Sequence, residues 1–417
     1  MIEALLERFA VDPRVAAAGR RAAGACEGGR ERAAARATVS AQMLAAFAAE
    51  GVADSDLAAT YGYGYDDRGR ERYDSLLRRI FGTESAFARL SLVSGTQAIT
   101  ATIEACTPAD GRVIAAAGRP YDTLRNALVD APHSLARRGA RYDEIPLADD
   151  GGVDHGGLER ACRAGVDVVL VQRSRGYAAR RSLSARECGE VARTVKRAAP
   201  QALVLVDNCY GELVEPTEPT HHGADAVMGS LIKNLGGGIA PGGAYVAGRR
   251  SVVERVAARH YAPGLGTALG PSFGLTRALL QGLFAAPQAV TECLAGLDFA
   301  AALFSELGEE VHPPAGAPRY DIVQAIRLGS RQRLLAFARG LQRAMPVNAR
   351  FAPEPGDVPG YREPVVMSAG AFIPGATIEL SCDAPLRPPF EVYLQGGTSR
   401  SHGMLGALLA ADSLAAC

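Results

Sequence analysis

The chain has 417 residues, 48% hydrophobic and 22% charged, and its 45 basic side chains balance 45 acidic ones. This composition indicates a globular protein large enough for two domains, and the zero net charge excludes a general attraction to nucleic acid or to anionic membranes. No apolar run reaches the roughly 18 residues of a membrane helix, and the N-terminus lacks the pattern of a secretion signal, so we expect a cytoplasmic protein. The eight cysteines form no C-x-x-C pair, which argues against a metal site or a disulfide framework.

The N-terminal part of the chain differs in composition and apolar pattern from the rest of the sequence. Residues 1–58 are rich in Ala, Arg and Glu with apolar residues at helical spacing, which predicts two or three helices outside the main core. Residues 60–74 (TYGYGYDDRGRERYD) are too polar for a buried strand and too rich in glycine for a helix at their start. They predict an extended loop that runs into a helix.

Between residues 85 and 250, short apolar runs alternate with helical patterns. The predicted strands are AFARLSLVSG, RVIAAAG, VDVVLVQ, ALVLVDN, DAVMGS and GAYVAG, and the helices between them include TQAITATIEAC and ARECGEVARTVKRAA. This alternation predicts an α/β fold with a mostly parallel central sheet covered by helices on both faces. After residue 265 a long helical pattern precedes short mixed elements, which predicts a smaller α+β domain. We therefore expect three segments, 1–58, 59–265 and 266–417.

Three groups of polar residues follow predicted strands, at the sheet edge where ligands of α/β proteins bind. Ser94, Gly95 and Thr96 form a strand-to-helix turn suited to a phosphate. Asp207 follows a buried strand, where a carboxylate is costly without a cationic partner, and Lys233 follows another strand. Each feature alone is explained by a helix cap or a surface cation. Together they match pyridoxal 5′-phosphate (PLP), which needs a phosphate site, a carboxylate for its pyridine nitrogen and a lysine for its aldehyde.

The motifs SGT, GRPYDTL, VDNCYGE and GSLIKN, in this order, resemble those of fold-type-I PLP enzymes (aspartate aminotransferase-like) of cysteine and methionine metabolism. More closely, YGYGYDDRGR, VQRSRGY, VDNCYGELVEPTEP, GSLIKNLGGGIAP and PLRPPFEVYLQGG are similar to the methionine γ-lyase-like branch often described as aluminium-resistance proteins. The resemblance extends from about residue 60 to residue 400. It implies a soluble homodimer or homotetramer that acts on a small amino acid.

The resemblance also implies roles for individual residues. Lys233 would bind PLP as a Schiff base and then move protons as the general base, while Asp207 would keep the pyridine nitrogen protonated. Gly95, Thr96 and Ser230 would bind the phosphate, next to Ser94. Tyr121 would stack on the cofactor ring and could protonate a leaving group, although ordinary core packing is the alternative.

The roles of two further sets of residues remain open. In the enzymes that the chain resembles, a tyrosine-containing loop reaches the phosphate of the neighbouring subunit, and Tyr63, Tyr65 or Arg68 is placed to do this; a loop that only packs in an interface is the alternative. The substrate carboxylate favours an arginine. Arg387 and Arg173 are equal candidates, Arg175 is another, and an internal salt bridge is the alternative.

The sequence departs from the pattern after RGY, where the family has an aromatic residue and a proline and this chain has Ala179 and Arg181. Such a change is expected to reshape the substrate pocket.

The leading hypothesis is γ-elimination, or the related β-elimination, from an L-amino acid. The leaving group is a thiolate or a halide, and chloride loss from a chloroallylglycine would give propargylglycine, a terminal alkyne. The alternatives are an aminotransferase, an aldolase or γ-replacement on the same cofactor, or a non-catalytic stress-response protein. NAD binding is disfavoured because the glycine runs lack a strand–GxGxxG–helix context.

Overall fold

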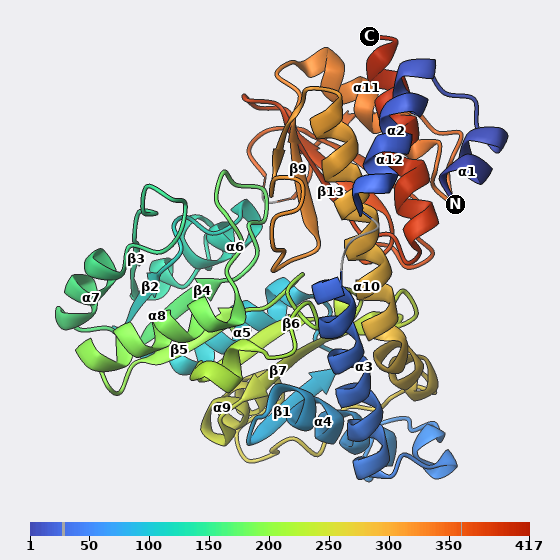
Figure 1. The fold of residues 1–417 in the computed structure, drawn as a ribbon. Helices are drawn as coiled ribbons and strands as arrows, with labels where there is room; N and C mark the ends of the chain where they lie inside the picture. The colour runs from blue at the N-terminus through green and yellow to red at the C-terminus, as the bar shows by residue number, and fades with distance from the viewer. Residues whose placement is uncertain (27–29, 360) are drawn as a thin grey trace.

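The computed structural model describes residues 1–26, 30–359 and 361–417, and it contains a large domain and a small domain joined by one long helix (Figure 1). The large domain is built on a seven-stranded sheet. Its strands are β1 (Ser85–Arg89), β2 (Arg112–Ala115), β3 (Arg141–Glu144), β4 (Val168–Gln172), β5 (Leu203–Asp207), β6 (Ala226–Ser230) and β7 (Ala244–Gly248).

The strand order is β1-β7-β6-β5-β4-β2-β3. Strands β3, β2, β4, β5 and β6 pair in parallel, and β7 pairs antiparallel to both β6 and β1. Strands β4 and β6 are buried along their whole length, as expected for a sheet covered on both faces. The predicted mostly parallel sheet is confirmed.

Helices cover both faces of this sheet. One face packs against α5 (Gly95–Cys106) and α9 (Arg250–His260), with α6 (Asp122–Arg125) at its edge. The other face packs against α4 (Arg68–Phe81), α7 (His155–Arg163) and α8 (Ala185–Ala198). The predicted loop at residues 60–74 is a loop up to Asp67, whose carboxylate caps α4. The carboxyl ends of the parallel strands therefore meet at one edge, next to the start of α5.

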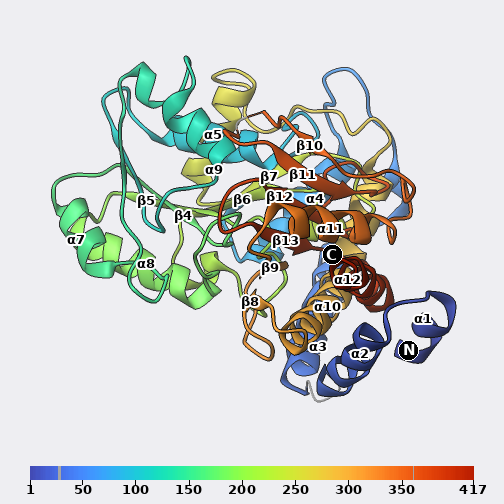
Figure 2. The same ribbon diagram turned by 90° about the horizontal axis from the view of Figure 1, so that it is seen from above.

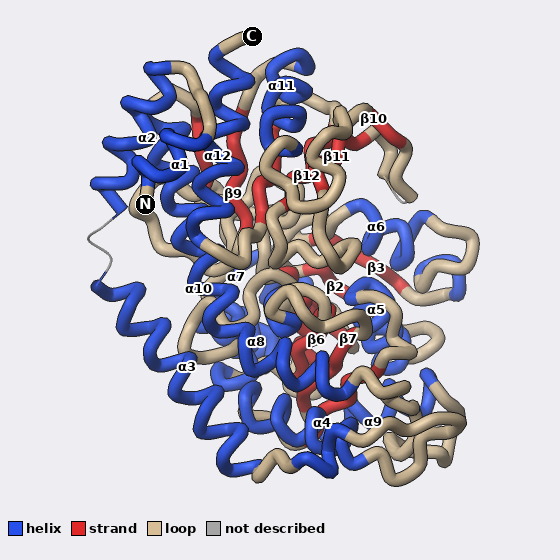
Figure 3. The backbone as a smooth tube through the Cα atoms, turned by 90° about the vertical axis from the view of Figure 1, so that its right-hand side faces the viewer, coloured by secondary structure: helices blue, strands red, loops and turns tan. Residues whose placement is uncertain are grey.

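The small domain begins with α10 (Thr276–Glu306), which runs between the two domains (Figures 1 and 3). An antiparallel sheet follows in the order β10-β11-β12-β13-β9-β8. Its strands are β8 (Glu310–His312), β9 (Val323–Arg327), β10 (Pro355–Gly356), β11 (Val365–Ala369), β12 (Ser381–Pro385) and β13 (Glu391–Gln395), and α11 (Arg331–Gln342) and α12 (Arg400–Ala415) complete the domain. The predicted α+β character of this region is confirmed.

The N-terminal helices are α1 (Ile2–Arg8), α2 (Pro13–Ala25) and α3 (Arg30–Glu50). Helix α2 buries Val15, Ala18 and Ala22 in the core that it shares with α10 and α12, and Figure 2 shows α1 and α2 beside these helices. The prediction that this segment lies outside the main core is therefore wrong for α2, and it is also wrong for α3, which buries Val39, Met43 and Ala46 in the same core. Among the described helices, none is long and apolar enough to cross a membrane.

Candidate active site

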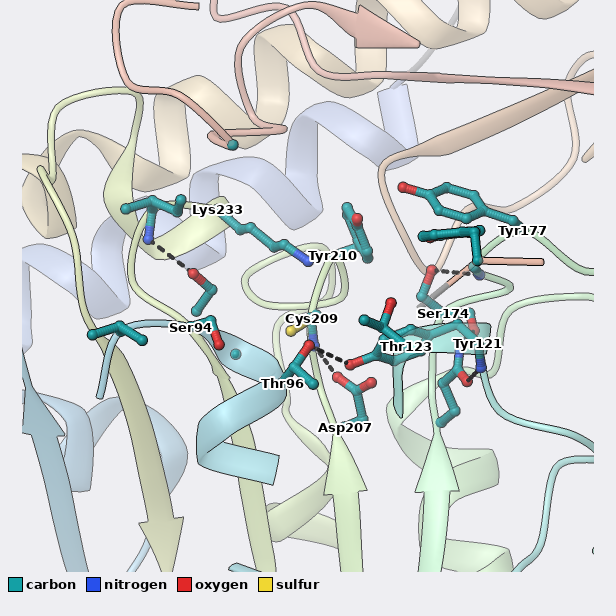
Figure 4. Close-up of a pocket in the computed structure, with 18 residues that line it drawn as sticks. Ser94, Thr96, Tyr121, Thr123, Ser174, Tyr177, Asp207, Cys209, Tyr210 and Lys233 are labelled. Atoms are coloured by element: carbon teal, nitrogen blue, oxygen red, sulfur yellow. Dashed lines mark hydrogen bonds between the residues drawn. The ribbon is translucent and has the colours of Figure 1, made fainter. Parts of the chain in front are cut away.

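A cavity of about 260 Å³ opens at the carboxyl ends of the parallel strands (Figure 4). The residues that line it come from the α5 turn, from the ends of β4, β5 and β6, and from the small domain. They are Val93, Ser94, Gly95, Thr96, Tyr121, Thr123, Gln172, Ser174, Gly176, Tyr177, Asp207, Cys209, Tyr210, Ser230, Ile232, Lys233, Tyr361 and Gly375. The predicted residues from four separate motifs are thus brought to one cavity.

The phosphate-binding turn expected at residues 94–96 is the first turn of α5. Ser94 caps the helix by accepting from the Gln97 N–H at 3.1 Å. A side chain at Gly95 would lie 3.1 Å from the Cys209 sulfur and 3.3 Å from the Ser230 nitrogen, so only glycine leaves this corner open. The helix N-terminus and the hydroxyls of Thr96 and Ser230 therefore present donors to one space, as an anionic phosphate requires.

Asp207 is the last residue of β5, and it is 3% exposed. Its Oδ1 accepts from the Cys209 N–H at 3.1 Å, and in the described part of the chain no cation lies within ion-pair distance of its carboxylate. Burial raises the pKa of Asp207, and the nearby Lys233 opposes that rise. A cationic group bound in the cavity would stabilise the charged carboxylate.

Lys233 lies directly before the short 3₁₀ turn Asn234–Gly236, and its side chain extends across the cavity. Its Nζ lies 3.9 Å from the centre of the Tyr210 ring (Figure 4). Burial favours the neutral amine, but the Cys209 sulfur, the phenols of two tyrosines and the Asp207 carboxylate outweigh burial and raise the pKa of Lys233. The amine thus has a cation–π contact rather than a bonded carboxylate.

Lysine is rare in this chain: Lys196 and Lys233 are the two that the sequence contains. Lys196 lies on α8, outside the cavity lining, and its Nζ is 2.8 Å from Asp225 Oδ2. Lys233 is therefore the lysine available to a ligand in the cavity.

Tyr121 lies at the start of α6, with its ring on the cavity wall above Asp207 in Figure 4. Its hydroxyl is 3.1 Å from Thr96 Oγ1, and its backbone N–H donates to Gln172 Oε1 at 3.2 Å. Burial, followed by the Asp207 charge, holds the pKa of Tyr121 well above its usual value. The ring position is compatible with stacking on a flat ligand, and the hydroxyl points to the phosphate turn.

The part of the cavity beyond Lys233 is a cluster of three tyrosines that the sequence did not single out, Tyr177, Tyr210 and Tyr361. Tyr177 follows β4, Tyr210 follows β5, and Tyr361 belongs to the small domain. The rings of Tyr177 and Tyr361 lie 6.1 Å apart. The motifs RGY and NCYGE contain two of these residues, but nothing in the sequence shows that they meet.

The structure does not bring Arg173 to the cavity. Its guanidinium is fully buried and bonds Glu218 at 2.9 Å and Glu215 at 2.6 Å, with Asn208 as a third partner at 2.7 Å. The expected role of Arg173 in binding a substrate carboxylate is therefore wrong, because both terminal nitrogens of its guanidinium group already bond other side chains. Arg173 forms the internal salt bridge that was the alternative.

Arg175 and Arg387 also lie outside the cavity lining. The Arg175 guanidinium donates to the carbonyls of Ala178 and His312, and it lies over the Tyr393 ring. Arg387 is half-exposed at the domain boundary, where it pairs with Asp122 at 3.3 Å and donates to the Tyr177 carbonyl at 3.0 Å. Of the two guanidinium groups, that of Arg387 bonds a residue of the cavity lining, Tyr177.

The sequence departures after RGY are also placed away from the cavity. Ala179 is exposed, and Arg181 forms surface ion pairs with Glu187 and Asp150. Neither residue lines the cavity. The expectation that these two changes reshape the substrate pocket is not supported by their positions.

The loop at residues 61–68 is exposed rather than part of the cavity. Tyr63 and Tyr65 are 74% and 61% exposed, and the Arg68 side chain is 64% exposed with its Nε 3.6 Å from Asp56. The loop is nevertheless ordered: the Tyr63 carbonyl accepts from the Gly270 N–H at 3.0 Å, and Arg70 donates to the Gly64 carbonyl at 2.6 Å. Exposed aromatic rings on an ordered loop are available to another protein surface.

Comparison with known proteins decides the family. The methionine γ-lyase family model matches residues 20–415. The chain belongs to the methionine γ-lyase family. The Bacillus subtilis protein YnbB, which is uncharacterised, is 38% identical over 377 residues, covering 89% of this chain and 90% of YnbB.

Two solved structures have nearly the same architecture. A Clostridium acetobutylicum protein proposed to be a cystathionine β-lyase involved in aluminium resistance is 37% identical, covers 99% of this chain and 98% of its own, and superposes with a TM-score of 0.94. A carbon–sulfur lyase involved in aluminium resistance from Clostridium novyi NT is 34% identical, with 98% of each chain covered and a TM-score of 0.93. The expected resemblance and the PLP fold type I are confirmed.

The cofactor of the methionine γ-lyase family is PLP, and the residues of this chain fit it. The open corner beside Gly95 and the α5 N-terminus suit the phosphate, and the buried Asp207 carboxylate lacks the cation that a protonated pyridine would supply. Lys233 is the amine that faces the same space. The cofactor expected from the sequence is therefore confirmed.

Proposed function

We propose that this member of the methionine γ-lyase family is a PLP-dependent lyase that eliminates a thiolate from the γ or β carbon of an L-amino acid. The observation that carries the proposal is that Lys233 and Asp207 line the same cavity, beside the N-terminus of α5. The lysine and the buried carboxylate do not bond each other. This arrangement leaves both groups free for a cofactor.

The bound cofactor supplies an electron sink for the amino acid Cα. The chain's own residues would hold it and move protons. The α5 turn with Thr96 and Ser230 would bind the phosphate, Asp207 would hold the proton on the ring nitrogen, and Tyr121 would cover one face of the ring. The Lys233 amine, which faces the same space, would carry protons between Cα and the neighbouring carbons of the substrate.

The substrate carboxylate needs a cation, and we assign this role to Arg387. Its partner Tyr177 lines the cavity, and its side chain is 36% exposed, so its weak pairs with Asp122 and Glu363 can exchange for a ligand. Binding the substrate there would also connect the two domains across the cavity.

We also propose that the chain works as a homo-oligomer, at least a dimer. The exposed apolar side chains near the cavity mouth gather on neighbouring segments: Tyr61, Tyr63, Tyr65, Val93, Leu265 and Phe273. Arg89 ties these segments together by donating to the carbonyls of Thr267 and Leu269. A second copy of this chain that covers this surface would bring Tyr63, Tyr65 or Arg68 close to the cavity.

Product analysis tests the proposed reaction. The protein with PLP is incubated with L-methionine, L-cystathionine and 4-chloroallylglycine, and thiol, 2-keto acid, chloride and terminal alkyne are measured. We expect thiol and 2-keto acid from a sulfur substrate, and none from the Lys233→Ala variant. Chloride with an alkyne product would instead assign a halide leaving group. Amino transfer to an added keto acid without elimination, or no turnover of any substrate, would overturn the proposal.

A further inference from the structure

The cavity holds a hydroxyl–carboxyl pair to which the proposed function gives no role. The Tyr177 hydroxyl, on the cavity wall, donates a hydrogen bond to Asp383 Oδ2. Tyr177 follows β4 in the large domain, whereas Asp383 lies on β12 of the small domain. The hydrogen bond therefore crosses the domain boundary at the cavity.

Asp383 is buried without a counter-ion. It is 7% exposed, and it also accepts from the neutral Gln395 amide, whose Nε2 donates to Oδ2 at 2.9 Å. In the described residues no cation lies within ion-pair distance of this carboxyl group. The more distant charge of Lys233 slightly favours its ionised form. Burial raises the pKa of Asp383, which favours the protonated form. A protonated Asp383 can give its proton to the Tyr177 oxygen.

The position of Tyr177 differs from that of Tyr121. The Tyr121 hydroxyl is engaged with Thr96 at the phosphate turn, whereas Tyr177 lies above Tyr121 and away from Thr96 in Figure 4. Tyr210, whose ring contacts Lys233 Nζ, lies on the same side of the cavity as Tyr177 in Figure 4. The side chain of a substrate whose Cα is next to Lys233 thus has the Tyr177 hydroxyl within the same part of the cavity.

We propose that Tyr177 is the general acid that protonates the leaving sulfur, and that Asp383 is the positioning residue that orients Tyr177 and replaces its proton. As the carbon–sulfur bond breaks, its electron pair leaves with sulfur, which takes the Tyr177 proton. The phenol oxygen takes the Asp383 proton in turn, so a thiol and a carboxylate form and no phenolate accumulates. Solvent or the Lys233 ammonium then returns a proton to Asp383. This inference rests on the proposed elimination.

The test varies the leaving group. An alkyl thiolate is a strong base and needs a proton, whereas chloride or a nitrothiophenolate leaves without one. Tyr177→Phe and Asp383→Asn, saturated with PLP, are each assayed with an S-alkyl substrate and with its chloro or S-nitrophenyl analogue. We expect kcat for the S-alkyl substrate to fall about 100-fold or more in Tyr177→Phe, and kcat for the activated analogue to fall less than about fivefold.

Tyr361→Phe is the matched control, because Tyr361 lines the same cavity and packs against Tyr177 without bonding Asp383. Tyr361→Phe should change kcat by the same factor for both substrates. The PLP dissociation constant and the melting temperature are measured for each variant. The dissociation constant should stay close to wild type in both variants, whereas Tyr177→Phe should melt at a lower temperature, because the buried Asp383 loses a hydrogen bond.

Equal losses on both leaving groups, or an undiminished rate on the S-alkyl substrate, would overturn the inference. If Tyr177→Phe does not fold, Asp383→Asn gives the same discrimination, since asparagine keeps the hydrogen bond but has no proton to supply. A wild-type protein that releases neither thiol nor chloride would instead refute the proposed elimination itself, so the two failures are distinguishable.

Discussion

At the scale of single residues, Glu212 shows how burial alone sets a protonation state in this protein. Its carboxyl group is completely buried, one oxygen accepts from the Tyr245 hydroxyl at 3.0 Å, and the other oxygen has no hydrogen-bond partner among the described residues. Burial raises the pKa of Glu212 from 4.5 to about 8. The folded protein therefore holds a proton that the unfolded chain releases between these two values, and stability falls as the pH rises through that window.

We expect Glu212→Gln to weaken this pH dependence. Glutamine resembles the protonated acid, so the variant should match wild type at pH 5 and be more stable than wild type at pH 8. The variant should remove up to about 1.4 kcal/mol per pH unit from the slope of unfolding free energy against pH. Thermal unfolding of the apo protein at both pH values measures this difference in stability. Glu254→Gln is the control, because Glu254 is an exposed glutamate on α9. Parallel pH profiles for wild type and Glu212→Gln would contradict the assignment.

Arg173 is the second residue with a testable structural role. Removing it leaves Glu218 buried without its cation and Glu215 without one of its partners, so Arg173→Leu should lose about 3–5 kcal/mol of stability. The KM of the remaining folded enzyme should stay close to wild type, because Arg173 does not reach the cavity. Arg387→Leu should do the reverse and raise KM with little effect on melting. A large rise in KM in Arg173→Leu would restore it as a substrate ligand.

The sequence predicts which side chains meet in the site where their meeting depends only on their positions at strand ends. Lys233 and Asp207 follow strands, and all parallel strands end at one edge, so their meeting follows from the predicted fold. The direction of a long side chain does not follow in this way, because Arg173 turns toward two glutamates more than 40 residues away. The Tyr177–Asp383 pair spans 206 residues and two domains, and no local pattern indicates it.

At the scale of elements, the glycines after Lys233 let α10 approach the loop that carries this lysine. A side chain at Gly282 on α10 would lie 2.5 Å from the Gly236 carbonyl, and one at Gly237 would lie 2.6 Å from the Gly282 carbonyl. Both contacts are with backbone, which cannot move aside as a flexible side chain can. The close packing thus fixes the 3₁₀ turn next to Lys233.

Gly282→Ala should displace this turn and weaken PLP binding about tenfold or more, although alanine is the better helix former. Titration of the apo protein with PLP gives the dissociation constant. Gly24→Ala on α2 is the matched control: its new methyl group meets no atom of the described residues within 4 Å, so PLP affinity should stay unchanged and the melting temperature should hold or rise. Unchanged PLP affinity in Gly282→Ala would contradict the role given to the contact.

Elements with strong apolar patterns were predicted from sequence, and weakly patterned ones were not. The buried strands β4, β5 and β6 and the helices α5, α8 and α10 lie where the apolar runs and the helical periodicity placed them. Strand β3, of sequence RYDE, was missed because it is a half-exposed edge strand with three charged residues. The first predicted strand was too long, since β1 ends at Arg89 and a loop continues to Ser94.

At the scale of the whole molecule, the exposed apolar surface beside the cavity predicts self-association. Phe273 and Leu265 are 56% and 48% exposed on the segment that packs against the 61–68 loop. Phe273→Asp with Leu265→Asp should shift the protein to monomers and lower activity, because charges at an apolar contact are costly to bury. Light scattering coupled to gel filtration measures the mass. Phe351→Asp is the control, because Phe351 is an exposed aromatic residue (68%) in the small domain.

A wild-type protein that is monomeric would contradict self-association, and an oligomer that persists in the double variant would place the contact on another surface. The change from an alternating to a helical pattern after residue 265 precedes α10, which begins at Thr276, while the domain boundary at residue 265 stays a prediction. The docking of α2 on the small domain was not predictable, since it joins residues almost 300 positions apart.

The central claim is that PLP attaches to Lys233, and the scarcity of lysine makes it directly measurable. The protein with PLP is reduced with borohydride, digested, and examined by mass spectrometry. We predict the mass of the reduced cofactor on the peptide that contains Lys233, its retention in Lys196→Arg and its loss in Lys233→Ala. Cofactor on the Lys196 peptide, or no covalently bound cofactor in the wild-type protein, would contradict the account.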